Sequence, residues 1–258
     1  MTTDELLFTR DGPVARITFN RPDARNAMTW AMYDALYEAC ERVDGDESIR
    51  ALVLRGAGGK AFVAGTDIAQ FRNFRTGEDG ISYERRMDRI VGRLEAARVP
   101  TLAVIEGYAV GGGLSLAAAC DLRVCTPDAR FGIPIARTLG NCLSAETCAR
   151  LVSLIGESRA LQLILTASFF TAEQALTAGL VAEVVEPERL DERADELVAQ
   201  LAGQAPLTMY ATKETLRRLR RANLPDASDL VALVYGSDDF KEGVRAFVDK
   251  RKPEWTGR

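Results

Sequence analysis

Three consecutive glycines at residues 111–113 separate two apolar segments, residues 101–105 and 114–119. The first segment is typical of a buried strand and the second of the start of a buried helix. Glycine at such a turn lets the backbone adopt unusual dihedral angles and approach a neighbouring group closely. The unpaired N–H groups of a helix start favour negative charge. The turn therefore predicts either a tight connection within a core or a site that stabilises an oxyanion.

The pattern along the chain alternates between strands and helices, which predicts an α/β fold. A second glycine turn, at Gly65, follows the apolar residues 61–64 and is expected to lead into a helix. Residues 71–82 are polar and predict a mobile loop beside a site. The segment near residues 203–205 marks a change to an all-helical tail, so we expect a core over residues 1–203 and a helical region over residues 204–258.

Composition excludes several classes of function. The net charge is −4, so a nucleic-acid partner is not expected. The chain has no histidine, which excludes Ser-His-Asp and Cys-His nucleophiles and any His-ligated zinc, and we expect no metal site. The five cysteines lack a CxxC pair and are expected to be buried. No apolar run reaches the roughly 18 residues of a membrane span and no secretory signal is present, which predicts a cytoplasmic protein without a membrane partner.

Four stretches, in this order, resemble the crotonase superfamily, the enoyl-CoA hydratase/isomerase family. They are residues 20–27, residues 61–68, residues 107–113 with the following Cys120 and Asp121, and residues 246–253. The resemblance implies a spiral of ββα turns followed by a helical C-terminal trimerisation region, in a homotrimer or a dimer of trimers. It also implies an acyl-CoA thioester as ligand, with coenzyme A as part of the substrate and no permanently bound cofactor.

The resemblance assigns the oxyanion hole to the backbone N–H groups of Ala64 and Gly112. These would hold the thioester oxygen as it gains enolate charge. Arg25 would meet a phosphate of coenzyme A, and Phe247 and Lys250 would reach the ligand of a neighbouring subunit, although Lys250 is as readily explained as a solvated surface lysine. The implied substrate-binding set is Arg25, Ala27, Ala64, Gly65, Thr66, Asp67, Ile68, Gly112, Phe247 and Lys250.

The sequence departs from the family at both glutamates that hydratases of this family use. Their positions hold Ser115, three residues after Gly112, and Ile135, which follows Phe-Gly-Ile-Pro. Hydration needs a base that activates water and an acid that protonates the α-carbon. A serine hydroxyl alone cannot act as that base and isoleucine carries no exchangeable proton. The two-glutamate hydration mechanism is therefore not available to these two residues.

Glu84 and Glu146 are candidate substitute acids, although each is also explained as a surface carboxylate on a charged helix. We expect an enzyme, a lyase or isomerase that processes acyl-CoA thioesters through an enolate held in the oxyanion hole. Decarboxylation, thioester hydrolysis or isomerisation with a substitute carboxylate stay open as reactions. Two further alternatives are a non-catalytic acyl-CoA-binding protein and a structural trimer.

Overall fold

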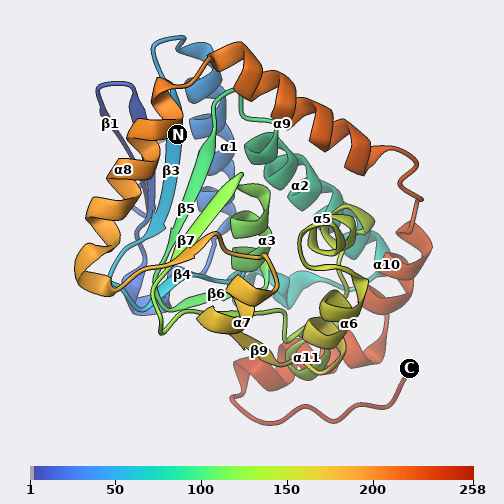
Figure 1. The fold of residues 1–258 in the computed structure, drawn as a ribbon. Coiled ribbons are helices and arrows are strands. Elements are labelled where there is room, and N and C mark those ends of the chain that lie inside the picture. Colours follow the sequence, from blue (N-terminus) through green and yellow to red (C-terminus); the bar gives the residue numbers. More distant parts are fainter. Residues whose placement is uncertain (1–2) are drawn as a thin grey trace.

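The computed structural model describes residues 3–258, which form two β-sheets wrapped by helices (Figure 1). The larger sheet has the strand order β1-β2-β3-β5-β7-β10. Its strands are β1 (Leu6–Asp11), β2 (Val14–Phe19), β3 (Ala51–Gly56), β5 (Thr101–Ile105), β7 (Leu122–Cys125) and β10 (Glu183–Val184). Only the β1–β2 pair is antiparallel among these described strands. The central strands are almost continuously apolar because helices cover both of their faces.

The smaller sheet has the strand order β4-β6-β8-β9. It consists of β4 (Ala61–Ala64), β6 (Tyr108–Val110), β8 (Arg130–Gly132) and β9 (Phe169–Thr171). The chain passes three times from the larger sheet to the smaller one, at β3–β4, β5–β6 and β7–β8, and each passage leads into helices. This repeated ββα unit confirms the predicted α/β spiral.

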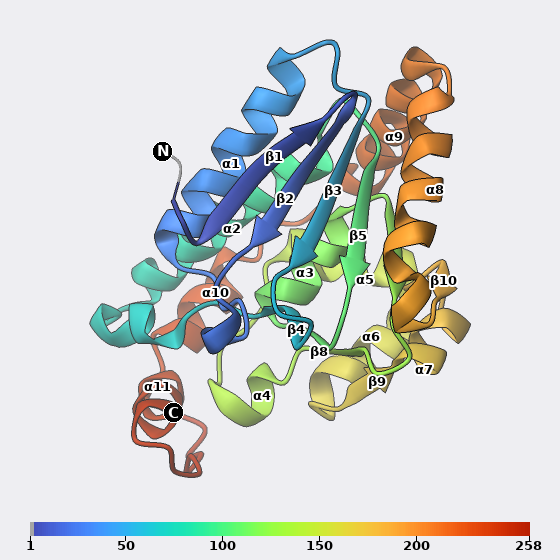
Figure 2. The ribbon, with the colours of Figure 1, turned by 90° about the vertical axis from the view of Figure 1, so that its left-hand side faces the viewer.

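Helices lie on both sides of the larger sheet, but in Figure 2 no helix of residues 3–258 lies in front of β1 and β2 (Figures 1 and 2). Helix α8 packs on one face through Leu190, Ala194 and Val198, and α1, α2 and α3 belong to the main core on the other. The helices up to residue 203 are η1 (Pro22–Ala24), α1 (Trp30–Gly45), η2 (Ile68–Asn73), α2 (Gly77–Glu95), α3 (Gly112–Ala119), α4 (Ile135–Thr138), α5 (Ala145–Ile155), α6 (Glu157–Leu165), α7 (Ala172–Thr177), η3 (Pro187–Arg189) and α8 (Leu190–Gly203). Among residues 3–258, no helix combines the length and apolar character needed to cross a membrane.

Three more helices follow: α9 (Pro206–Arg221), α10 (Ser228–Tyr235) and α11 (Asp238–Val248). Helix α9 runs across the top of the view in Figure 1, α10 lies at its right-hand side and α11 at the bottom. Helix α10 packs against α2, and α11 packs against η2. The C-terminal helices thus reach the same region as the two glycine turns.

The prediction of a mobile loop over residues 71–82 is wrong. Helix η2 occupies the first part of this segment, and α2 already begins at Gly77. The Asp79 carboxylate accepts a hydrogen bond from the Thr76 N–H at 2.9 Å and so closes the first turn of α2. Gly80 permits the close approach of α10, because a Cβ atom there would lie 2.2 Å from the Tyr235 ring. The polar sequence of this segment predicted a loop, whereas packing against α10 stabilises a helix there.

Candidate active site

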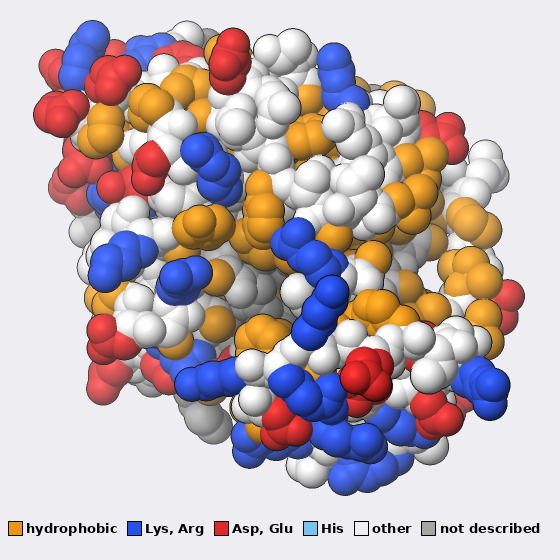
Figure 3. Space-filling view, turned by 90° about the horizontal axis from the view of Figure 1, so that it is seen from below, with side chains coloured by type: hydrophobic (Ala, Val, Ile, Leu, Met, Phe, Trp, Pro, Cys, Tyr) orange, Lys and Arg blue, Asp and Glu red, His pale blue; other side chains and the backbone are white. Residues whose placement is uncertain are grey.

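A cavity of about 430 Å³ lies where η2, α2, α3 and the segment between β8 and α5 meet. Residues from the two glycine turns, from α2 and from the C-terminal region line it together. The lining includes these site residues predicted from the sequence: Arg25, Ala27, Ala64, Gly65, Thr66, Asp67, Ile68, Glu84, Gly112, Ser115, Ile135 and Phe247. The lower face of the molecule is hollowed, and Lys and Arg side chains gather around the hollow (Figure 3).

The backbone N–H groups at the glycine turns form the polar floor of this cavity. The assignment of a free donor to Ala64 is wrong, because its N–H donates to the Arg25 carbonyl at 3.0 Å. Thr66 lines the cavity, and no group within residues 3–258 accepts a hydrogen bond from its N–H. Gly112 is the first residue of α3, where the N–H has no partner inside the helix. A Cβ atom on Gly112 would lie 3.8 Å from the Thr66 nitrogen, so the two donors are neighbours.

Three hydroxyl groups lie beside these donors. The Tyr33 and Thr66 hydroxyls are 2.8 Å apart, and the Thr66 and Tyr83 hydroxyls are 3.1 Å apart. Burial raises the pKa of Tyr33 to about 12 and the pKa of Tyr83 well above its ordinary value. Both phenols therefore stay neutral and can donate hydrogen bonds, but neither is a proton acceptor at neutral pH.

Glu84 supplies a carboxyl group to the same cavity. Its residue is only 8% exposed, and its Oε1 accepts a hydrogen bond of 2.6 Å from the Tyr235 hydroxyl. Burial raises the pKa of Glu84 to about 8, against the opposing effect of the hydrogen bonds from Tyr235 and the Ser144 backbone. No Lys or Arg within residues 3–258 forms an ion pair with it. The cavity thus contains a carboxyl that changes protonation state near neutral pH, as a general acid or base requires.

The two positions that lack the family's glutamates also line the cavity. Ser115 lies on α3, one turn after Gly111, and its hydroxyl donates to the Gly111 carbonyl at 3.4 Å. Ile135 begins α4 and is 9% exposed. Cys142 lines the same space, and burial raises its thiol pKa to about 12, so the reactive thiolate is disfavoured. Of these three side chains, none is a suitable proton carrier at neutral pH.

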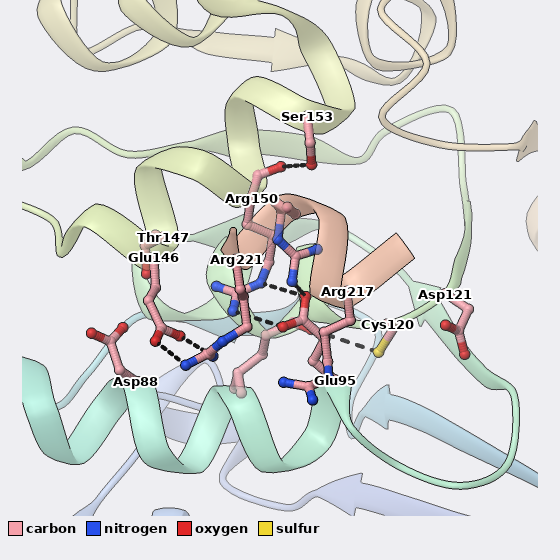
Figure 4. Close-up of polar contacts among 12 residues, drawn as sticks. Asp88, Glu95, Cys120, Asp121, Glu146, Thr147, Arg150, Ser153, Arg217 and Arg221 are labelled. Atoms are coloured by element: carbon pink, nitrogen blue, oxygen red, sulfur yellow. Dashed lines mark hydrogen bonds and ion pairs between the residues drawn. The ribbon is translucent and has the colours of Figure 1, made fainter. Parts of the chain in front are cut away.

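The other predicted carboxylate, Glu146, lies outside the lining of this cavity. Its Oε2 accepts a hydrogen bond of 2.6 Å from Arg221, an ion pair that Figure 4 shows. Lys250 is exposed and also lies outside the lining. Of the two candidate acids, Glu84 is therefore the one that lines the cavity.

The outer part of the cavity carries the residues expected to meet coenzyme A. Arg25 is exposed, and its guanidinium lies 5.6 Å from the centre of the Tyr108 ring. Asp67 caps η2 through the Ala69 N–H and forms an ion pair of 3.2 Å with Arg21. Phe247 of α11 is 51% exposed at the edge of the cavity. Their contact with the ligand stays a prediction.

Two tyrosines of the site were missed in the sequence. Tyr33 lies on the buried face of α1, where the sequence pattern predicts an ordinary core residue. Tyr235 is 151 residues away from Glu84, so no local pattern links them. A general rule could have pointed to them: a buried tyrosine hydroxyl needs a hydrogen-bond partner, so a tyrosine on a buried face predicts a second polar group in the interior.

No group of three or more Cys, Asp and Glu side chains within residues 3–258 is arranged to hold a metal ion. Around the glycine turns the polar groups of the cavity are N–H donors and hydroxyls, with the Glu84 carboxyl beyond them and the Asp67 carboxylate paired with Arg21. The donors suit an oxygen anion better than a cation.

The fold and this site define a class of protein with known relatives. The sequence profile described as enoyl-CoA hydratase/isomerase matches residues 9–258. The chain is 33% identical to a short-chain-enoyl-CoA hydratase of Clostridium acetobutylicum, over 98% of each chain, and 34% identical to a 2,3-dehydroadipyl-CoA hydratase of Escherichia coli K12, over 98% of this chain and 99% of the relative. The protein belongs to the enoyl-CoA hydratase/isomerase family, within the crotonase superfamily.

Solved structures agree with this assignment. A methylmalonyl-CoA decarboxylase in complex with 2-nitronate-propionyl-CoA matches with a TM-score of 0.91 and 28% identity, over 100% of both chains. An enoyl-CoA hydratase/carnithine racemase from Magnetospirillum magneticum matches with a TM-score of 0.81 and 33% identity, over 100% of this chain and 97% of that one. The same fold therefore carries more than one reaction among the relatives, and the reaction of this chain has to be argued from its own side chains.

Proposed function

We propose that the protein is an acyl-CoA-processing enzyme that moves a proton at the α-carbon of the acyl group, through a thioester enolate. The observation that carries the proposal is that two N–H groups, on Thr66 and Gly112, which have no hydrogen-bond acceptor in the described part of the chain, lie in one cavity with the buried carboxyl of Glu84. The alternative of a non-catalytic acyl-CoA-binding protein needs the donors but gives no reason for the carboxyl.

The two N–H groups would hold the thioester oxygen. When the α C–H bond breaks, its electron pair moves onto this oxygen, and the proton passes to the Glu84 carboxylate. Preorganised donors stabilise the charge that develops there, because they need no reorganisation at the moment of reaction; removing one such donor costs about 3–4 kcal/mol in other enzymes. The Tyr33 hydroxyl, next to Gly112, supports the position of Thr66 through their shared hydrogen bond.

Glu84 would carry the proton in both directions. Since its pKa is raised to about 8, the protonated and the ionised form coexist near neutral pH. The ionised form removes a proton from the α-carbon, as an isomerase requires. The protonated form returns a proton to an enolate, as is needed after decarboxylation. A single carboxyl thus serves both classes of reaction, whereas hydration by two glutamates would need partners at Ser115 and Ile135.

Decarboxylation is the second candidate, favoured by the high structural similarity to methylmalonyl-CoA decarboxylase. In that reaction a carboxylate bond to the α-carbon breaks and releases carbon dioxide, the electron pair forms the enolate, and Glu84 protonates the α-carbon. The predominance of the protonated acid below about pH 8 suits this direction.

The helical C-terminal region is proposed to form a homotrimer or a dimer of trimers. Within residues 3–258 no residue of helix α9 is fully buried, and Leu207, Leu216 and Leu219 are exposed on it. Light scattering on the purified protein tests this part of the proposal, and a monomer at micromolar concentration would contradict it.

The experiment for the proposed function is exchange of the α-hydrogens of butyryl-CoA in D₂O, followed by mass spectrometry. We expect exchange by the wild type and a loss of about 10²–10⁴-fold in Glu84→Gln, the usual contribution of a positioned acid or base. Glu78→Gln, at an exposed position of the same helix, is the matched control and should exchange like the wild type. Binding without exchange, and without turnover of malonyl-, enoyl- and hydroxyacyl-CoA, would reject the proposal and favour the binding protein.

A further inference from the structure

A second cavity, of about 460 Å³, lies next to the first along α2. It is lined by residues of α2, by the start of α5 and by the connection between α9 and α10. Exposed residues at its rim, Arg85, Pro225 and Asp226, connect it with solvent. Its interior carries Asp88, Ser144, Glu146 and Arg221, so it is polar and large enough to hold several water molecules.

Glu84 lines both cavities. Asp88 follows it by one helical turn, so the two carboxyls project from the same face of α2. The Ser144 backbone hydrogen-bonds to Glu84, and the Ser144 hydroxyl donates to Asp88 Oδ1 at 2.6 Å. The same hydroxyl lies 3.2 Å from the Thr147 hydroxyl, and Thr147 lines the first cavity. Polar groups therefore continue from the acyl cavity into the second one.

When an acyl group occupies the first cavity, Glu84 needs another path for protons to and from solvent. A bound acyl group fills the first cavity and expels its water. Glu84 is only 8% exposed, so its carboxyl then has no direct access to solvent on that side. A proton taken from the α-carbon would return to the same carbon unless it leaves by another path.

We propose that the second cavity is the route by which protons pass between Glu84 and solvent while the acyl group occupies the first cavity, with Asp88 and Ser144 as relay groups. The inference rests on the proposed function of Glu84. The proton of the Glu84 carboxylic acid moves to a water molecule or to the Asp88 carboxylate, and Asp88 passes a proton to solvent at the rim. A solvent proton returns along the same groups, so no atom or charge is gained or lost over the cycle.

The surroundings of Asp88 suit a relay that works near neutral pH. Burial and the nearby Glu146 of α5 raise the pKa of Asp88 to about 6, against the effects of Ser144, Arg150 and Arg221. On its own helix Asp88 has Glu84 and the exposed Arg85 as neighbours, and Arg221 reaches the cavity from α9. Glu146 is itself paired with Arg221 (Figure 4). Asp88 accepts the Ser144 hydrogen bond at Oδ1, and no group within residues 3–258 donates to its Oδ2, which is therefore available for exchange.

The test uses deuterium exchange into the α-position of butyryl-CoA by the full-length protein. We expect Asp88→Ala to slow exchange by about tenfold with little change in the Kd for butyryl-CoA, because the relay does not touch the ligand. Formate, a small carboxylate that fits the vacated space, should restore exchange in a concentration-dependent way. Asp226→Ala, at the rim of the same cavity but outside the chain of groups, is the control and should behave like the wild type.

Ser144→Ala is the second variant and guards against misfolding of the first. It keeps Asp88 but removes the hydroxyl, and we expect it to slow exchange severalfold without a response to formate. Unchanged exchange in both variants, with Glu84→Gln inactive, would overturn the route and leave the proposed function standing. A slow Asp88→Ala enzyme that formate does not restore would also overturn it. Normal exchange by Glu84→Gln would overturn the proposed function and the route together.

Discussion

Helix α2 carries two buried glutamates, Glu84 and Glu95, in opposite electrostatic surroundings. Glu95 receives hydrogen bonds of 3.1 and 3.3 Å from Arg150 and pairs with Arg220 as well (Figure 4). Glu84 receives hydrogen bonds only from uncharged partners, the Tyr235 hydroxyl and the Ser144 backbone, within the described chain. Burial is almost the same, 8% and 9% exposed.

The difference separates a structural carboxylate from one that is available for chemistry. A charge inside a protein is tolerated when opposite charges and hydrogen bonds compensate for its lost hydration. Glu95 meets that condition, and it ties α2 to α5 and α9. Glu84 does not, so its neutral form is favoured at neutral pH, and it faces a cavity instead of a cation. Perturbed carboxyls in cavities are where catalytic acids are found.

The largest effect that we expect from this comparison is on stability. Glu95→Gln leaves Arg150 and Arg220 without their counter-charge and should lower the free energy of unfolding by about 3–5 kcal/mol. Glu84→Gln replaces a neutral acid by a neutral amide and should change it by about 1 kcal/mol at pH 6. Urea unfolding followed by circular dichroism measures both. A larger loss in Glu84→Gln than in Glu95→Gln would reverse the comparison.

The second expectation concerns pH. The pKa of Glu84 is raised from 4.5 to about 8 on folding, so its contribution to stability is fully present below about pH 4.5 and is lost as the pH rises through about 8. Relative to Glu84→Gln, the wild type should lose on the order of 3 kcal/mol between pH 5 and pH 8. Urea unfolding of both proteins at several pH values gives this difference, and a constant difference would show that Glu84 titrates normally.

Substitution of Gly112 tests whether the Glu84 carboxyl acts together with the N–H groups of Thr66 and Gly112. A Cβ atom at this position would lie 2.7 Å from the Tyr33 hydroxyl, so Gly112→Ala must displace Tyr33 and weaken its hydrogen bond to Thr66. We expect α-hydrogen exchange to fall by about 10²-fold, the usual effect of a misplacement near 1 Å. Gly45→Ala, where a Cβ atom meets open space, is the control. Full exchange by Gly112→Ala would separate the glycine turn from the chemistry.

The smallest expected effect is that of Tyr235 on the pKa of Glu84. Its hydroxyl hydrogen-bonds to the Glu84 carboxyl and lowers the pKa that burial raises. Tyr235→Phe should therefore move the pH profile of α-hydrogen exchange towards higher pH by about one unit, in line with the value of one such hydrogen bond. Tyr210→Phe, at an exposed position, should leave the profile in place. A shift towards lower pH would contradict the role given to Tyr235.

Much of the fold could be predicted because its signals are local. The apolar strands, the Thr29 cap of α1 and the two glycine turns follow from the neighbouring sequence, and α1 begins as expected, with the Thr29 hydroxyl accepting from the Met32 N–H. The prediction for residues 71–82 was wrong because the start of α2 depends on α10, whose Tyr235 packs against Gly80 from 155 residues further along the chain.

The candidate site could be predicted only in part, for a similar reason. The glycine turns indicated where donors would lie, but which N–H group stays unpaired depends on the Arg25 carbonyl, which binds Ala64 and leaves Thr66 available. The choice between Glu84 and Glu146 depends on partners from other helices: Tyr235 of α10 contacts Glu84, and Arg221 of α9 contacts Glu146. Sequence spacing identifies carboxylates on a helix, but not the charges that fold against them.

The protonation state of Glu84 is the property on which the proposed chemistry depends most directly. Infrared difference spectra between the wild type and Glu84→Gln isolate the carbonyl band of its carboxylic acid, over a pH titration. We expect this band at pH 6 and its loss with a midpoint near pH 8, the raised pKa of Glu84. A carboxylate at pH 6, with no acid band in the difference spectrum, would contradict the assignment of Glu84 as the proton carrier.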